Sequence, residues 1–173
     1  MSARVAKLYG AGHVIITGLP ADNPREQARL SLAAKFGCDQ FLEVGKHDIE
    51  AEVKRNFPDG VDRVIVSSPP ASMADALKII KFGGIITFYG LDFGGDSVIN
   101  VDVNDLIFRK ISLIPTFAEP AINFPVSNRL LREGLVDADL LISHTFTLEQ
   151  TRDTMQAIID GTQPIIKAVM TND

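Results

Sequence analysis

The sequence predicts an α/β fold in which parallel strands are connected by crossover helices. Short runs of β-branched residues alternate with segments whose apolar residues recur at helical spacing, as expected for strand–helix–strand units. The chain has 173 residues, 46% of them hydrophobic, which is enough to bury one substantial core. We therefore expect consecutive βαβ units that share a core.

Strands are expected where β-branched residues cluster between turn-forming residues. The expected strands are residues 13–17, 40–44, 63–67, 85–89, 111–116 and 165–170. The expected helices are residues 24–36, 49–57, 72–82, a segment that starts near Asn104, 125–133 and 148–160. Asn23 before Pro24 is typical of a helix start, and Gly37 stands where that helix should stop.

The first residues predict a sheet that lacks its first strand. Residues 3–9 have the pattern of the end of a helix, and Gly10-Ala11-Gly12 is interpreted as its stop. These letters match G-x-G, but a phosphate-binding G-x-G-x-x-G follows a strand and opens a helix, which is the reverse order. We therefore expect the first strand and its Gly-rich loop to be missing.

Charge and composition exclude several classes of function. The net charge of −5 leaves no basic surplus for a nucleic acid, and no apolar run approaches the roughly 18 residues of a membrane span. The N-terminus also lacks the apolar stretch of a signal peptide, so a soluble, cytoplasmic protein is expected.

Metal-ligating residues are scarce. The single cysteine, Cys38, excludes an internal disulfide and a multi-thiolate zinc site, and we interpret it as a small buried hydrophobe. The three histidines, His13, His47 and His144, are too scattered in the chain to suggest a metal site. No catalytic residue and no metal ligand is expected in this chain.

Several stretches, in this order and spacing, resemble the nucleotide-binding half of the medium-chain dehydrogenase family. They are AKLYGAGHVIITG, ARLSLAAKFGCDQFLEV, VDRVIVSSPP, ALKIIKFGGIITFYG, LLREGLVDADLLISHTFTLEQ and IIKAVMTND, and together they cover nearly the whole chain. The LISHTFTLEQ and IIKAVM segments resemble zinc-type alcohol, polyol or threonine dehydrogenases more than zinc-free quinone-reductase-like members.

This resemblance implies a Rossmann-like, doubly wound parallel sheet over residues 1–118, without its first strand and Gly-rich loop. It also implies that residues 119–173 are C-terminal helices and a strand that pack toward a catalytic domain. The implied cofactor is NAD or NADP. The zinc ligands would lie in an N-terminal domain that this sequence lacks, so the chain alone is expected to be inactive.

Two alternatives stay open. In one, the chain is a stand-alone module that binds a nucleotide or oligomerises without chemistry. In the other, it is a fragment of a zinc-free quinone-reductase-like member.

The resemblance places the adenosine ribose near the end of the strand at 13–17. In the family an acidic residue usually ends that strand and accepts hydrogen bonds from the ribose, but here the position is Gly18. Without that carboxylate a 2′-phosphate is repelled less, so NADP becomes possible, with Arg25 and Arg29 near its 2′-phosphate. Alternatively, the two arginines form a solvated helix face, and Asp22 serves the ribose from a displaced position.

The other cofactor positions implied by the resemblance follow later strands. Hydroxyls at Ser67 and Ser68 suit the adenine or the nearer ribose, although the sequence there is also typical of a simple turn. The nicotinamide would pass Gly90 and Leu91, and its carboxamide would meet Thr116 and Phe117, but Pro115 has no amide hydrogen to donate. Lys167 matches a basic position near the C-terminus that contacts a cofactor phosphate in the family, or it is a strand lysine that faces solvent.

A homo-oligomer is also expected. Losing a central strand removes several buried side chains worth roughly 1.5 to 3 kcal/mol each, which is comparable with the stability of a whole domain. We expect either that the strands at 13–17 and 63–67 close up or that a second chain fills or covers the gap, and residues 98–101 and 111–115 are the candidate edges for contact with a second chain.

Overall fold

The computed structural model describes residues 1–95, 97–117 and 120–172, and the chain divides into two compact units. The first unit combines Met1–His47 with Pro120–Asp173, and the second is Asp48–Glu119. Each unit is considered by itself below. The predicted boundary between residues 118 and 119 lies outside the described residues, so that boundary stays a prediction.

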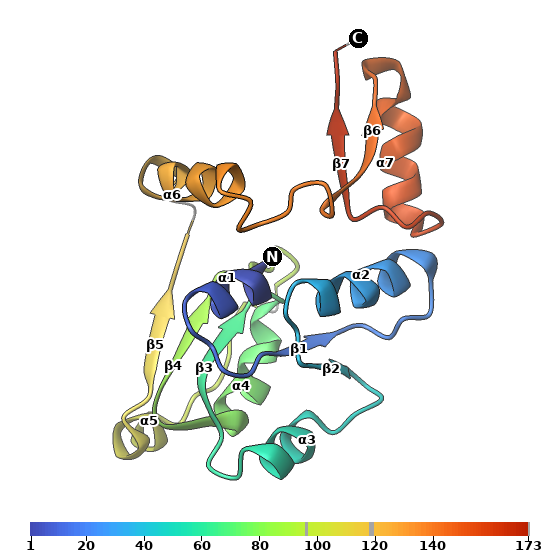
Figure 1. Ribbon diagram of the computed structural model, residues 1–173. Helices are drawn as coiled ribbons and strands as arrows, with labels where there is room; N and C mark the ends of the chain where they lie inside the picture. Colours follow the sequence, from blue (N-terminus) through green and yellow to red (C-terminus); the bar gives the residue numbers. More distant parts are fainter. Residues whose placement is uncertain (96, 118–119, 173) are drawn as a thin grey trace. The chain divides into compact units, whose positions relative to one another are not determined.

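The first unit contains two small parallel sheets (Figure 1). Its elements are α1 (Ser2–Leu8), β1 (Ile15–Gly18), α2 (Pro24–Lys35), β2 (Gln40–Glu43), α6 (Pro120–Arg132), β6 (Ile142–Phe146), a 3-10 turn (Leu148–Gln150), α7 (Thr151–Asp160) and β7 (Lys167–Met170). Strand β1 pairs with β2, so that Gly18 lies opposite Glu43, and β6 pairs with β7.

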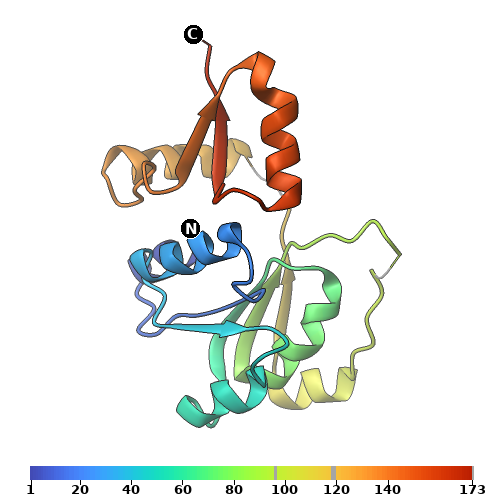
Figure 2. The same ribbon diagram turned by 90° about the vertical axis from the view of Figure 1, so that its right-hand side faces the viewer.

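The second unit is a three-stranded parallel sheet with helices packed on it (Figures 1 and 2). Its elements are α3 (Ile49–Asn56), β3 (Val61–Val66), a 3-10 turn (Pro70–Ser72), α4 (Met73–Ile79), β4 (Ile80–Phe88), α5 (Val103–Arg109) and β5 (Ser112–Pro115). The strand order is β3-β4-β5, and α4 packs against β3 and β4.

The core of the second unit lies between α4 and this sheet. Its buried side chains are Val66, Met73, Ala76, Ile80, Ile86 and Ile111. Ile86 in the central strand β4 is fully buried because it belongs to the cluster in which residues of α4 cover the sheet face.

Polar contacts join distant segments of the first unit. Arg4 Nε donates to the carbonyl oxygen of Leu135 at 2.6 Å, and Lys7 Nζ lies 2.6 Å from Asp39 Oδ2. The same carboxylate oxygen accepts from the amide of Val14 at 2.7 Å, which fixes the entry into β1. At the start of α2 the Asn23 side chain accepts from Glu26 N at 3.0 Å, as the Asn-Pro pair predicts.

The predicted α/β class with parallel strands is confirmed, and so are the six expected strands within one to five residues at their ends. Strand β1 pairs with β2, and β3 pairs with β4; the missing first strand stays a prediction. Strand β6 was not among the expected strands.

One expectation about the elements is wrong. The helix predicted over 72–82 ends at Ile79, and the backbone at Ile80 turns into β4. The Arg109 guanidinium donates to the carbonyl oxygens of Leu77 and Ile80 where the helix ends. A Cβ on Gly60 would overlap the carbonyl oxygen of Ile79, so these backbones lie in direct contact. The segment 98–101, a candidate edge for contact with a second chain, forms no strand in the described structure.

No helix in the described ranges is long and apolar enough to cross a membrane.

Candidate functional site

The strongest grouping of predicted site residues lies at the carboxyl ends of β3, β4 and β5. Ser67-Ser68 follow β3, Gly90-Leu91 follow β4, and Thr116-Phe117 follow β5. The amide of Tyr89 donates to Val66 O at 3.1 Å and the amide of Thr116 to Phe88 O at 2.9 Å, so pairing continues to these ends. The parallel sheet therefore brings the three predicted pairs to one edge, which we call the triple-strand edge.

Gly90 is required by the contact between two loops of this edge. A Cβ at this position would overlap the carbonyl oxygen of Ser68, although the backbone conformation of Gly90 is one that other residues adopt. The absence of a side chain therefore lets the segments after β3 and β4 touch. The sequence allows two interpretations of Gly90, a tight turn and a close approach to a ligand. The tight contact is present, and the ligand contact at Gly90 stays a prediction.

The triple-strand edge offers hydroxyl groups beside exposed apolar side chains. Ser67 and Ser68 are exposed, Leu91 is 58% exposed and Phe117 is 74% exposed. Pro115 is the last residue of β5 and has no amide hydrogen, so Thr116 supplies the first donor beyond that strand. Such an edge suits a ligand with both hydroxyl groups and flat apolar rings.

Gly18 ends β1 in the first unit, opposite Glu43. A Cβ on Gly18 would lie 2.8 Å from Cζ of Phe41, so the Phe41 ring would have to move to admit any side chain. The Phe41 ring therefore lies against the position that a side chain at residue 18 would occupy.

The two predicted arginines of α2 are both engaged. Arg25 Nη1 donates to the carbonyl oxygen of Ile158 in the last turn of α7 at 3.3 Å, and Arg25 Nε is buried without a hydrogen-bond partner in the described residues. Arg29 pairs with Glu26 at 3.2 Å on the exposed face of the helix.

A polar cluster missed by sequence reasoning connects the loops after β1 and β2, and we call it the Lys46 cluster. Lys46 Nζ lies 3.2 Å from Asp22 Oδ1 and 3.3 Å from Glu43 Oε1. Glu43 Oε1 also accepts from the amide of Ala21 at 2.9 Å. This backbone donor and Lys46 lower the pKa of Glu43, while the hydrogen bonds to Asp22 and Glu43 raise the pKa of Lys46.

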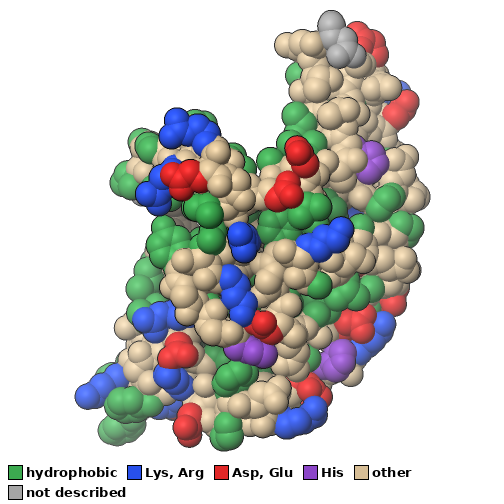
Figure 3. Space-filling model, in the orientation of Figure 1, with side chains coloured by type: hydrophobic (Ala, Val, Ile, Leu, Met, Phe, Trp, Pro, Cys, Tyr) green, Lys and Arg blue, Asp and Glu red, His purple; other side chains and the backbone are tan. Residues whose placement is uncertain are grey.

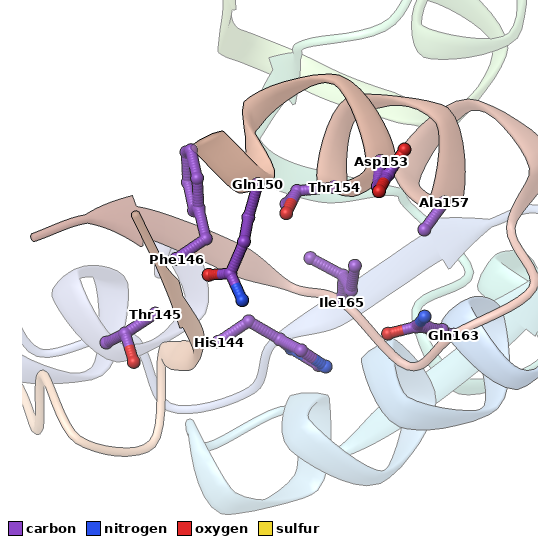
Figure 4. A pocket seen from close by; sticks show the side chains of 9 residues that line it. All are labelled: His144, Thr145, Phe146, Gln150, Asp153, Thr154, Ala157, Gln163 and Ile165. Atoms are coloured by element: carbon purple, nitrogen blue, oxygen red, sulfur yellow. The ribbon is translucent and has the colours of Figure 1, made fainter. Parts of the chain in front are cut away.

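Lys167 opens β7 and is exposed, and its amide lies within 3.3 Å of Ser143 Oγ. A pocket of about 230 Å³ lies in the same unit, between β6 and α7 (Figure 4). Its lining includes His144, Gln150, Asp153 and Thr154, and none of the predicted cofactor residues.

Histidine and cysteine side chains have local roles. His47 Nδ1 accepts from the amide of Glu43 at 2.9 Å, and His144 Nδ1 lies 3.0 Å from Ser143 Oγ. Cys38 is only partly buried, and this burial raises the pKa of its thiol. Over the described ranges, no group of three or more histidine, cysteine or acidic residues could hold a metal ion. On the face drawn in Figure 3, basic and acidic side chains are interspersed.

Comparison with known proteins gives a family match and a fold match. The family model for "Zinc-binding dehydrogenase" matches residues 1–130. The chain is 28% identical to the sorbitol dehydrogenase of Bacillus subtilis over 172 residues, which is 98% of this chain and 46% of that protein. The chain therefore spans about half the length of the curated relatives it matches.

Two solved structures show the same fold. The Escherichia coli CFT073 alcohol dehydrogenase rspB, complexed with NADH, has a TM-score of 0.81 and 20% identity, covering 98% of this chain and 48% of that one. A zinc-binding dehydrogenase of Sinorhizobium meliloti, bound to NADP, has a TM-score of 0.79 and 22% identity, with the same coverage. The resemblance and the Rossmann-like fold class expected from the sequence are confirmed.

Proposed function

This chain belongs to the zinc-binding dehydrogenase family, and from that premise we propose that it is the part of an alcohol- or polyol-type oxidoreductase that binds NAD or NADP. The observation that carries the proposal is the triple-strand edge. In open α/β sheets, ligands bind outside the carboxyl ends of the strands. The relatives that share this fold include one bound to NADH and one bound to NADP.

The residues of the triple-strand edge fit the two ends of a dinucleotide. Ser67 and Ser68 offer hydroxyls for a ribose, while the backbone at Gly90 and Leu91 suits a flat ring that needs close approach. Thr116 and Phe117 would contact the carboxamide of that ring. The bound dinucleotide would supply the hydride acceptor or donor of the reaction.

The first unit holds the other residues that the resemblance implies as cofactor contacts. Gly18 presents no carboxylate at the end of β1, and Lys167 offers a cation for a phosphate. Arg25 and Arg29 would meet a 2′-phosphate if the cofactor is NADP. The sequence contains no G-x-G-x-x-G after a strand, so we propose that the pyrophosphate is held by polypeptide outside these 173 residues.

The zinc ligands and the proton relay would likewise come from the half of the relatives that this chain does not match. We therefore propose that the chain alone does not turn over substrate. In this proposal residues 1–118 bind the cofactor, and residues 119–173 pack toward the catalytic half.

The test is a titration of the purified protein with NADH and NADPH, followed by amide chemical shifts and by nucleotide fluorescence. We expect shifts at Ser67, Ser68 and Gly90, and weaker binding in the double variant Ser67→Ala/Ser68→Ala. Ser112→Ala is the matched control, because Ser112 begins β5 at the opposite end from Thr116. Binding that is absent at millimolar nucleotide, or that shifts only residues away from this edge, would contradict the proposal.

We also propose that the protein forms a homo-oligomer through the edge strand β5 and the segment 98–101. Strand β5 ends the β3-β4-β5 sheet, and exposed apolar side chains lie on these segments, including Val98 at 84% and Ile114 at 45% exposure. Sedimentation of the wild type and of Val98→Lys tests this: the wild type should sediment as an oligomer, and the variant should shift toward monomer. A monomeric wild type would rule this oligomer out.

A further inference from the structure

The pocket between β6 and α7 has no role in the proposed function. It has a volume of about 230 Å³, and its nine lining residues all come from the continuous segment 144–165 of the first unit (Figure 4). A water molecule takes up about 30 Å³ of the liquid, so this space suits a ligand of roughly ten non-hydrogen atoms. The walls of the pocket therefore belong to one strand–helix–strand unit.

One wall of the pocket is a face of α7 with short side chains. Asp153, Thr154 and Ala157 line it, and Ala157 follows the other two by four and three positions, as residues on one helical face do. The larger apolar side chains Met155 and Ile159 of the same helix do not line the pocket and are 50% and 73% exposed. The helix therefore leaves the space beside β6 unfilled.

Two polar side chains at the pocket have one group engaged and one group left for a ligand. Gln150 Oε1 accepts from the amide of Thr147 at 2.9 Å, so Gln150 Nε2 remains as a donor, and the Gln150 amide extends toward His144 in Figure 4. His144 Nδ1 lies 3.0 Å from Ser143 Oγ. His144 Nε2 therefore remains, as a donor or as an acceptor according to the tautomer.

Asp153 and Gln163 add further free groups. No hydrogen bond within the described ranges uses either side chain, and both are exposed. The Asp153 carboxylate accepts, whereas the Gln163 amide both donates and accepts. Phe146, Ala157 and Ile165 form the apolar part of the lining, and Ile165 is only 3% exposed. The pocket thus combines donors, acceptors and an apolar surface, as sites for small ligands do.

The charge of the lining decides the class of ligand. Among the nine lining residues Asp153 is the only acidic one, and there is no lysine or arginine. A phosphate or carboxylate would lose its hydration without gaining a cationic partner. Asp153 also lies in the first turn of α7, where the positive end of the helix dipole offsets its attraction for a cation.

Hydroxyl groups fit this lining, because each one both donates and accepts. A hydroxyl can pair with the Asp153 carboxylate, with either amide and with either tautomer of His144. We infer that this pocket binds a small neutral polyhydroxylated molecule, such as a sugar or a polyol, with its carbon-bound hydrogens against Phe146 and Ile165. None of the residues assigned to the dinucleotide lines the pocket, so this second ligand site does not depend on the proposed function.

The test is a titration of the purified 173-residue protein with glucose and mannitol, followed by amide chemical shifts. We expect shifts at His144, Gln150 and Asp153 with dissociation constants of about 1 mM, since few groups hold a small ligand. Gluconate, a carboxylate of the same carbon number, should bind at least about tenfold more weakly than glucose.

Two results of this titration would overturn the inference. The first is the absence of shifts at these residues in glucose or mannitol at about a hundred times the expected dissociation constant. The second is tighter binding of gluconate or of ethanolamine than of glucose, which would assign the pocket to a charged ligand.

Ala157→Leu tests the location of the site. Leucine adds carbon atoms on the wall of the pocket and is a good helix former, so glucose binding should weaken about tenfold or more with unchanged circular dichroism. Met155→Leu is the matched control, because it introduces the same residue into α7 outside the pocket lining and should leave binding unchanged. Equal glucose binding by Ala157→Leu and the wild type overturns the inference.

Asp153→Asn tests the role of charge with little change in side-chain size. Glucose should still bind, because the amide oxygen accepts in place of the carboxylate, and the preference for glucose over gluconate should fall about tenfold. An unchanged preference in this variant would show that the pocket does not select its ligand through Asp153.

Discussion

The two units of this chain are stabilised in different ways. In the second unit, apolar side chains from α4, β3 and β4, together with Ile111 just before β5, form one continuous buried cluster that includes Ile80 and Ile86. In the first unit, side-chain bonds to distant backbone atoms, such as Arg4 to Leu135 and Arg25 to Ile158, join segments that are far apart in sequence. The second unit thus has one continuous buried cluster, whereas the first unit combines separate buried side chains, such as Phe36 and Leu42, with polar links between distant segments.

This difference has a consequence for function. The triple-strand edge is anchored in a close-packed core, so its loops should keep their geometry over a wide range of solution conditions. The Lys46 cluster depends on exposed ion pairs, which salt screens and which contribute little to stability. The contacts of the Lys46 cluster should therefore weaken with rising ionic strength more than the packing of the triple-strand edge does.

The largest effect is expected from Ile86→Ala. Ile86 is fully buried, and removal of its side chain leaves a cavity at the centre of β4, so the free energy of unfolding should fall by about 2 to 5 kcal/mol. Urea unfolding followed by circular dichroism measures this change. Ile107→Ala on the exposed face of α5 is the control and should change stability by less than about 0.5 kcal/mol. A small effect at Ile86 would mean that the second unit has no continuous core.

A smaller effect is expected from Gly90→Ala. The new methyl group would overlap the carbonyl oxygen of Ser68, and relieving such overpacking costs about 1 to 3 kcal/mol. We expect a lower melting temperature and faster amide exchange at the ends of β3 and β4. Gly12→Ala is the control, since no atom lies within 4 Å of a Cβ at that position. Equal stability of the two variants would refute the loop contact.

In the first unit, Asn23→Ala tests the cap of α2. The variant loses the bond from Glu26 N to the Asn23 side chain, and helix caps of this kind contribute about 1 kcal/mol. Asn23→Asp keeps the acceptor and should retain wild-type stability in the same urea titration. If both variants lose stability equally, the side chain acts through its packing near Gly161 and not as a cap.

The smallest effect is expected from pH. The hydrogen bond from Lys7, followed by that from the amide of Val14, lowers the pKa of Asp39 in the folded state. The stabilising contribution is therefore complete above the ordinary carboxyl pKa of about 4, and is lost as the pH falls through and below that value. The stability difference between wild type and Asp39→Asn should shrink as urea midpoints are measured from pH 7 down to about pH 3. A difference that stays constant with pH would show that the Asp39 charge is not involved.

Local sequence signals were enough to predict most elements of the fold. Clusters of β-branched residues placed β1 to β5, helical spacing placed α2, and the Asn23-Pro24 pair marked the start of α2. The end of α4 was not predictable in this way, because Arg109 and Gly60, both distant in sequence, decide where that helix stops.

The candidate site was predicted unevenly. Ser67, Gly90 and Thr116 follow strands directly, so parallel pairing alone brings them to one edge. Glu43 and Lys46 gave no such signal, since their three-residue separation is common on any polar surface. Their link to Asp22 appears only when β1 and β2 pair and bring the two loops together.

The sequence by itself determined the α/β class, the order of the elements and the family, because these depend on local periodicity and on the order of short motifs along the chain. The tertiary structure decided which groups meet: Gly90 with Ser68, Gly18 with Phe41, and Lys46 with both Asp22 and Glu43. These contacts depend on strand register and on the packing of distant side chains, and no local pattern of residues specifies either one.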